Sequence, residues 1–324
     1  MVKVASINYD NKEKGNTRLE FKIDGSEINY IIINTIRRTI LTDIPIYAWT
    51  DFNFNNNTSV FHNNYLKNQI KNIPVWGIEN DIDFFEMDKT VKEEVEELNE
   101  DLEDNIDLTV DKNVDSTSLN QITMYLDYEN KTKEIETITT EMAKFYFSQK
   151  QIENPYPIPI QLVKLQPNQK INFSVISSIG TEKSSSIYSP VSICVYEDNK
   201  DNFRFIIESR GQITEKRIFK VCFININKKL KTILAQASND NSIIKEGEIE
   251  INNEDHTMGN LLSFGLQRHK DVQFAGYFMP HPLEKRVIIN YKLKAGKFKD
   301  ILKDVIDDFI DIFDKIDKEI GKAL

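Results

Sequence analysis

The sequence predicts an α+β fold in which one structural plan occurs twice along 324 residues. The plan is a strand, an amphipathic helix, further strands and a long amphipathic helix, and it begins near Arg18 and again near Glu246. A β-rich stretch interrupts the first copy and is too long to be a loop. Because neither copy can cover its own apolar helix faces, we expect the two copies to pack against each other.

The first copy opens with Leu19, Phe21 and Ile23 in alternation with polar residues, which predicts a short strand. Ser26 is then expected to cap a helix that ends before Pro45. The apolar side of this helix consists of isoleucines at helical spacing, namely Ile28, Ile31, Ile32, Ile36 and Ile40.

A second strand is expected over residues 45–54, followed by a short amphipathic helix that ends at Pro74. Residues 79–107 are strongly acidic, with only Lys89 and Lys92 against them. Like charges repel, so this run indicates a solvated helix or an open loop; a docking site for a basic partner is the alternative.

Residues 108–201 have the pattern of a β-rich module, with expected strands at 121–128, 158–165, 171–178 and 191–196. We therefore expect an inserted domain over residues 79–202. Residues 203–208 then predict the strand that resumes the first copy. Thr214 can cap the long helix that follows, whose stripe is Ile218, Cys222, Ile226, Leu230, Ile233 and Leu234.

The second copy follows a polar linker over residues 238–247. Its first helix has Met258, Leu261, Leu262 and Leu266 on one face, and two strands surround a turn at Pro280. The final helix has the strongest periodicity in the chain, carried by Phe298, Ile301, Leu302, Val305, Phe309, Phe313, Ile316 and Ile320. Such a stripe must be buried against another element.

Composition argues against several classes of function, although a local basic patch is compatible with it. The net charge is -10, whereas a protein that grips DNA by itself is more often basic. No apolar run approaches the roughly 20 residues of a membrane span, and no signal peptide is evident, so an intracellular protein is expected. The two cysteines, Cys194 and Cys222, are too few for a disulfide framework or a four-thiolate zinc site.

No motif indicates catalysis, a cofactor or a metal. The four histidines have no metal-ligand spacing, and no Walker, GxGxxG or GxSxG motif occurs. Asp81 and Asp83 form a DxD pair that could hold magnesium, but an acidic run is more often solvated. An alternative function, from a different class of protein, is a nucleotide-processing enzyme that uses these two acids.

Two segments carry a resemblance to a known family. The segment NTIRRTILTDIPIYA, residues 34–48, with NTSVFHNNYLKNQIKNIPV, residues 57–75, resembles the alpha subunit family of multisubunit RNA polymerases. That family includes bacterial alpha, archaeal D and the third subunit of polymerase II. Near the C-terminus, DHTMGNLL with FAGYFMPHPLEKRVII is similar to the eleventh subunit of polymerase II and archaeal L. The chain thus resembles two subunits fused end to end, as in large cytoplasmic DNA viruses.

The resemblance implies two copies of the alpha-like dimerisation fold in one chain. The first copy would comprise residues 1–78 and 203–240, and the second residues 246–324. Pairing would be internal, so no homo-oligomer is expected, and it would use Ile32, Ile36, Ile40, Met258, Leu261, Leu262, Phe309 and Phe313.

The implied function is a non-catalytic assembly platform that recruits the second-largest and then the largest polymerase subunit, with small assembly subunits. DNA would be met only through the complex, and the magnesium site would belong to the partners. The implied surface for the second-largest subunit comprises Asn34, Arg37, Arg38, Asn57, Thr58 and Ser59. As an alternative, the two arginines only complement the helix dipole.

The sequence departs from the family in three places. The inserted region has no cysteine zinc loop or iron–sulfur motif, the basic glycine-rich loop is reduced to SSIGTEKSSSIYSPV, and no DNA-binding domain follows the last helix. A scaffold of a different complex is therefore a third reading. If the origin is viral, the expected location is the host cytoplasm and possibly the virion.

Overall fold

The computed structural model describes residues 3–11, 17–76, 121–147, 150–199, 202–237 and 246–323. It divides into two compact units. We call residues 1–44 with 181–324 the core unit and residues 45–180 the insert unit.

The first half of the core unit is a four-stranded antiparallel sheet with two helices. The strand order is β1 (Lys3–Asn11), β2 (Thr17–Asp24), β11 (Phe203–Ser209), β10 (Val191–Asp198). Helix α1 (Tyr30–Thr42) contacts β10, and α4 (Glu215–Ala237) contacts β11. The sheet is joined to α4 by three aromatic rings at centroid distances of 5.4–5.9 Å, those of Phe21, Phe205 and Phe219.

The second half is a three-stranded antiparallel sheet with two helices. Its strand order is β12 (Glu246–Asn252), β14 (Arg286–Leu293), β13 (Val272–Phe278). Helix α5 (His256–Arg268) lies on β13 and β14, and α6 (Phe298–Ala323) ends the chain. A Cβ at Gly259 would lie 2.6 Å from Tyr277, so the close approach of α5 to its sheet requires glycine there.

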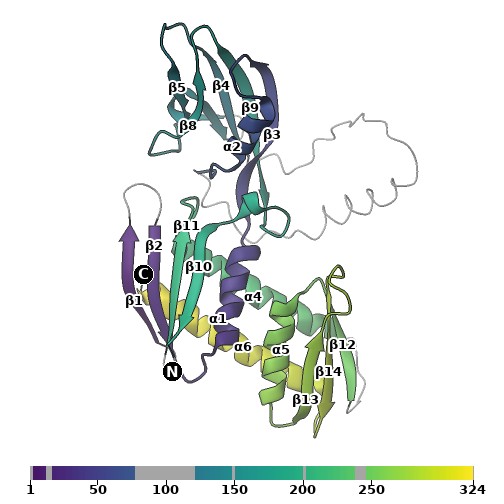
Figure 1. Ribbon diagram of the computed structural model, residues 1–324. Coiled ribbons are helices and arrows are strands. Elements are labelled where there is room, and N and C mark those ends of the chain that lie inside the picture. Colours follow the sequence, from purple (N-terminus) through teal and green to yellow (C-terminus); the bar gives the residue numbers. More distant parts are fainter. Residues whose placement is uncertain are drawn as a thin grey trace, which may run out of the picture. The chain divides into compact units, whose positions relative to one another are not determined.

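Helices of both halves form one layer between the two sheets (Figure 1). Helix α1 contacts α4 and α5, and α6 contacts both α4 and α5. Close packing of α5 on α6 is evident at Gly265, where an added Cβ would lie 2.5 Å from Val305 and 2.6 Å from Phe309. All eight residues expected to form the internal pairing are buried: Ile32, Ile36, Ile40, Met258, Leu261, Leu262, Phe309 and Phe313.

The insert unit is β-rich, as expected. Its main sheet has the order β3 (Ile46–Asn57), β9 (Lys170–Gly180), β4 (Ile122–Glu129), β6 (Lys144–Phe147), β7 (Lys150–Ile152). A second sheet pairs β5 (Glu136–Thr139) with β8 (Gln161–Leu165), and α2 (Asn63–Lys71) follows β3. Short 3-10 turns lie at Thr140–Met142 in this unit and at Ser186–Tyr188 in the core unit.

The unit boundaries differ from the expected domain boundaries. The expected insertion covered residues 79–202, whereas the insert unit covers 45–180. Strand β3 pairs with β9 from Ile46↔Gly180 onward, and β10 pairs with β11 in the core unit. The chain therefore leaves and re-enters the core unit at two adjacent strand ends, and the change in composition at residue 79 does not mark the border.

Two further observations concern local structure and the membrane. The helix cap expected at Ser26 lies instead at Asn29, whose Oδ1 accepts bonds from the backbone N–H of Ile31 and Ile32 at 2.9 and 3.2 Å. Among the described residues, no helix is both long and apolar enough to cross a membrane.

Candidate functional site

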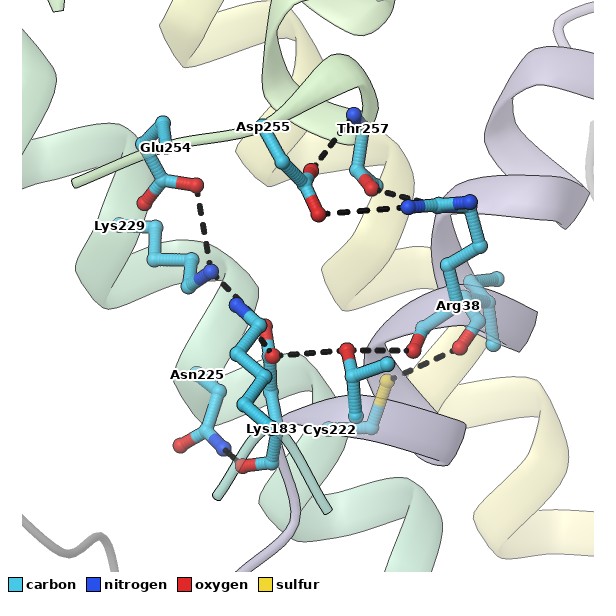
Figure 2. Close-up of polar contacts among 11 residues, drawn as sticks. Arg38, Lys183, Cys222, Asn225, Lys229, Glu254, Asp255 and Thr257 are labelled. Atoms are coloured by element: carbon cyan, nitrogen blue, oxygen red, sulfur yellow. Dashed lines mark hydrogen bonds and ion pairs between the residues drawn. The ribbon is translucent and has the colours of Figure 1, made fainter. Parts of the chain in front are cut away.

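Polar contacts join the C-terminal end of α1 to the N-terminal end of α5 in the core unit. Helix α1 presents Ile36 and Ile40 to the interior, both fully buried. Arg38 therefore lies on another side of the helix. Its Nε donates to Thr257 Oγ1 at 2.7 Å, and its Nη2 contacts Asp255 Oδ2 at 3.3 Å (Figure 2).

Asp255 contacts Arg38 of the first half and also residues of its own half. As the N-cap of α5 it also accepts from the backbone N–H of Thr257 at 2.7 Å. Burial acts to raise the pKa of Asp255, but the bonds from Thr257 and the nearby Lys183 and Arg38 lower it below its ordinary value. The carboxylate is thus held ionised where the first half meets the second.

A buried charge chain adjoins this contact. Asp43, the C-cap of α1, has Lys183 and Lys229 each at 2.8 Å, and Lys229 also lies 3.2 Å from Glu254 (Figure 2). The side chains of Asp43 and Glu254 are only 11% and 10% exposed. Asn225 Nδ2 also donates to the Asp43 carbonyl at 2.7 Å.

The pKa values in this charge chain move in both directions. Burial, with some repulsion from Asp43, raises the pKa of Glu254 above its ordinary value despite Lys229 and Lys183. Burial acts to raise the pKa of Asp43, but Lys229 and Lys183 lower it below its ordinary value. Burial likewise acts to lower the pKa of Lys229, but Glu254 and Asp43 raise it above its ordinary value. Because an unpaired buried charge is costly, these ion pairs fix how α1, α4 and the start of α5 meet.

A small pocket of about 160 Å³ opens beside Arg38. Both halves contribute to its lining, which consists of Ile31, Asn34, Thr35 and Arg38 from α1, with His256, Thr257, Asn260 and Tyr277. The pocket is thus rich in amide, hydroxyl and imidazole groups, and a partner residue that entered it would touch both halves.

The expected partner-facing residues are divided between the two units. Asn34 and Arg38 line the pocket, whereas the Nε of Arg37 donates to the Cys194 carbonyl of β10 at 3.1 Å. Asn57, Thr58 and Ser59 lie in the insert unit. There, Asn57 Nδ2 donates to Asn63 Oδ1 at 2.7 Å and Asn57 Oδ1 accepts from Ser59 Oγ at 2.6 Å. These last bonds hold the turn between β3 and α2.

Sequence reasoning missed the buried charge chain. Asp43, Lys183, Lys229 and Glu254 are far apart in the sequence, and nothing local pairs them. Asp255 carried a usable signal, since an aspartate two residues before Thr257 at the start of an apolar helix pattern is typical of an N-cap.

The described residues form neither a metal-binding cluster nor a reactive thiol site. No group of three or more His, Cys, Asp or Glu is placed to hold a metal among the described residues, and Asp81 and Asp83 lie outside them. Cys194 and Cys222 are buried free thiols against α1. Burial raises the pKa of Cys194 to about 12 and that of Cys222 well above its ordinary value, so both thiols are protonated.

Comparison with known proteins relates this chain to subunits of RNA polymerases. Residues 246–319 match the RNA polymerase Rpb3/Rpb11 dimerisation domain. A protein of Acanthamoeba polyphaga mimivirus, provisionally named DNA directed RNA polymerase subunit R470, is 27% identical over 292 residues, which make up 85% of this chain and 82% of that protein.

Two archaeal proteins are similar over a shorter stretch. The DNA-directed RNA polymerase subunit Rpo11 of Saccharolobus solfataricus is 50% identical over 42 residues, and that of Saccharolobus shibatae is 48% identical over 42 residues. Each alignment covers 13% of this chain and 46% of the archaeal subunit.

The fold and these likenesses confirm the resemblance to alpha-like subunits of DNA-directed RNA polymerases. Residues 246–319 are a dimerisation domain of the Rpb3/Rpb11 type, and most of the chain is related to a viral protein named as a polymerase subunit.

Proposed function

We propose that this chain is the assembly platform of a DNA-directed RNA polymerase, built as an alpha-like dimer within one polypeptide. The observation that carries the proposal is the single helix layer shared by both halves, in which α1 contacts α5 and α6 contacts α4. In this proposal the first half of the core unit, residues 1–44 and 181–240, pairs with residues 246–324 inside the chain and needs no second copy.

The proposed partners are the second-largest subunit first and the largest subunit next, together with small assembly subunits. The proposed surface for the second-largest subunit comprises the α1 pocket with Asn34, Arg37 and Arg38, and the turn at Asn57, Thr58 and Ser59. Since Arg38 also contacts Asp255 and Thr257, only part of its hydrogen-bonding capacity remains for a partner.

The chain itself has no catalytic role in this proposal. Nucleotidyl transfer and its magnesium ions belong to the two large subunits, and DNA is met only through the complex. Given a viral origin, which the likeness to a mimivirus protein supports, the proposed locations are the host cytoplasm and the virion.

Reconstitution tests the proposal. The full chain is mixed with the second-largest subunit from the same genome, the largest subunit is added, and complexes are separated by size-exclusion chromatography. We expect a stable binary complex, then a ternary one, and no nucleotidyl transfer by the chain alone. Failure to bind either large subunit, or transfer by the chain alone, would contradict the proposal.

A pocket variant locates the surface. Asn34→Arg fills the α1 pocket with a bulky cation and should weaken binding of the second-largest subunit by about tenfold. Asn252→Arg, at an exposed position of β12, is the matched control and should bind normally. Equal binding by both variants would remove the pocket from the interface.

A further inference from the structure

The α1 pocket is lined by hydrogen-bond donors and by no carboxylate. Its polar lining includes the guanidinium of Arg38 and the amides of Asn34 from α1 and Asn260 from α5. Among the described residues, no Asp or Glu belongs to this lining, although acids outnumber Lys and Arg in the whole chain by 51 to 41. Asp255 pairs with Arg38 from outside the lining.

Several donors at the pocket are not used by the chain itself. The Nε of Arg38 donates to Thr257 and its Nη2 contacts Asp255, which leaves the Nη1 group available. Asn34 and Asn260 are half-buried and have no hydrogen bond to another residue in the described ranges. Both oxygens of Asp255 are engaged, Oδ1 by the Thr257 N–H and Oδ2 by Arg38. A concave site with surplus donors favours an occupant that accepts hydrogen bonds.

The electrostatic surroundings of the pocket favour negative charge. Burial acts to raise the pKa of the neighbouring Asp255, but the bonds from Thr257 and the charges of Lys183 and Arg38 lower it below its ordinary value. The pocket also adjoins the first turn of α5, where the helix dipole is positive. A second carboxylate at this place would thus meet cations and free donors.

We propose that the α1 pocket receives an aspartate or glutamate side chain of the second-largest subunit. This inference rests on the proposed function and names the group that enters the pocket. At about 160 Å³ the pocket is smaller than a typical small-molecule site, so a single side chain fits it better than a cofactor. The carboxylate accepts hydrogen bonds from Asn34 and Arg38 of the first half and from Asn260 of the second.

Other occupants fit this lining less well. A lysine or arginine of the partner would face Arg38 without a counter-charge in the lining, and an apolar side chain would leave the two amides unpaired. Because neither half alone supplies both amides, the proposed carboxylate site is complete only when the two halves are paired.

Substitutions at Asn34 test the charge of the occupant. Asn34→Asp keeps the size of the side chain but replaces a donor with a negative charge, so it should weaken binding of the second-largest subunit by about tenfold or more. Asn34→Leu removes the amide without adding charge and should weaken binding only severalfold. Asn252→Asp, the same change at an exposed position of β12, is the matched control and should bind like the parent.

A second site guards against a local folding defect. Asn260→Asp places the same charge on the opposite wall, in the first half of α5, and should give a similar loss. Biolayer interferometry at low and high salt measures each affinity, and circular dichroism checks that each variant is folded. The loss in both aspartate variants should shrink at high salt, because the repulsion is screened.

Three results separate the outcomes. Folded aspartate variants that bind as tightly as the parent, or more tightly, would overturn the proposal, because the occupant would then be neutral or cationic. Tighter binding by Asn34→Leu than by the parent would also overturn it, in favour of an apolar occupant. A parent chain that does not bind the second-largest subunit would instead contradict the proposed function on which this inference rests.

Discussion

Asp43 connects three segments of the core unit. It caps α1 and pairs with Lys183, which follows the insert unit, and with Lys229 of α4. Through Lys229 it is linked to Glu254, at the start of the second half. A carboxylate in this position determines the angle at which α1 reaches α5, because moving any member of the chain strands a buried charge.

The pH dependence of stability tests this role. The pKa of Asp43 is lowered from an ordinary value of 3.8, so its stabilisation is complete above that pH and is lost as the pH falls through the folded-state pKa. Asp43→Asn should cost about 2 kcal/mol or more at pH 7, since it removes one partner of a buried pair. We expect the difference from the parent, measured by urea unfolding, to shrink below pH 3.8. A difference that persists unchanged at low pH would mean that packing, not charge, is responsible.

Arg38 stabilises the same junction from a more exposed position. Its side chain is 39% exposed, so the ion pair with Asp255 is worth roughly 0.5–1 kcal/mol after screening. Arg38→Lys should lose part of this, because an ammonium group cannot reproduce the forked contact with Thr257 and Asp255. Arg38→Glu should lose more, through repulsion by Asp255, yet leave the chain folded.

Urea unfolding with circular dichroism at two salt concentrations measures both Arg38 variants. The loss in Arg38→Glu should be smaller at high salt. Lys270→Glu, at an exposed position after α5, is the control. If Arg38→Glu and Lys270→Glu were equally stable, the contact would have no energetic role.

Among the elements, α6 is the one on which the pairing depends most. Its stripe is buried from Phe298 to Ile320, and Phe313 meets Phe223 of α4 with ring centroids 6.3 Å apart. Phe309 lies against α5 where Gly265 allows close approach. One helix of the second half thus contacts a helix of each half.

Phe309→Asp should place a charge in this core without a partner. Phe309 is 4% exposed, so we expect a loss of roughly 3 kcal/mol or more in the free energy of unfolding. Asp308→Phe, at the exposed neighbouring position, tests whether the loss comes from burial. Thermal melting of both variants is the measurement. A Phe309→Asp chain that melts with the parent would make α6 peripheral.

Helices with strong apolar periodicity could be predicted from the sequence. Their exact ends, and the strands that pair at a distance, could not. The isoleucines of α1 and the stripe of α6 repeat at helical spacing, so the buried face of each helix could be predicted. Strand β2 was predicted but β1 was missed, because β1 is defined by its antiparallel pairing with β2 and no local pattern marks it. The cap at Asn29 in place of Ser26 shows that several polar residues before a helix compete, and the tertiary position of the helix selects one.

In the candidate site, Asn34 and Arg38 were named from the sequence and line the pocket, but their contacts could not be assigned. Arg37 and Arg38 were expected to face a partner, and the structure has Arg37 bonded to β10 and Arg38 bonded to α5. Both contacts join residues more than 150 positions apart, which no local pattern encodes. The insert unit likewise begins at the start of β3, shortly after α1, and the composition of the chain does not mark that border.

At the scale of the whole molecule, the two halves of the core unit pair with each other inside one chain. This pairing accounts for the shared helix layer, the buried apolar stripes and the charges that cross between the halves. It also explains why residues 246–319 match a dimerisation domain although they are joined to the other half.

The most direct test cuts the chain within residues 238–247, between α4 and β12, and coexpresses residues 1–240 with residues 246–324. Because each fragment alone exposes an apolar helix stripe, we expect the two to purify together as a 1:1 complex by size-exclusion chromatography with light scattering. Phe313→Asp in the shorter fragment should prevent association. Two fragments that each fold and stay apart would contradict the account.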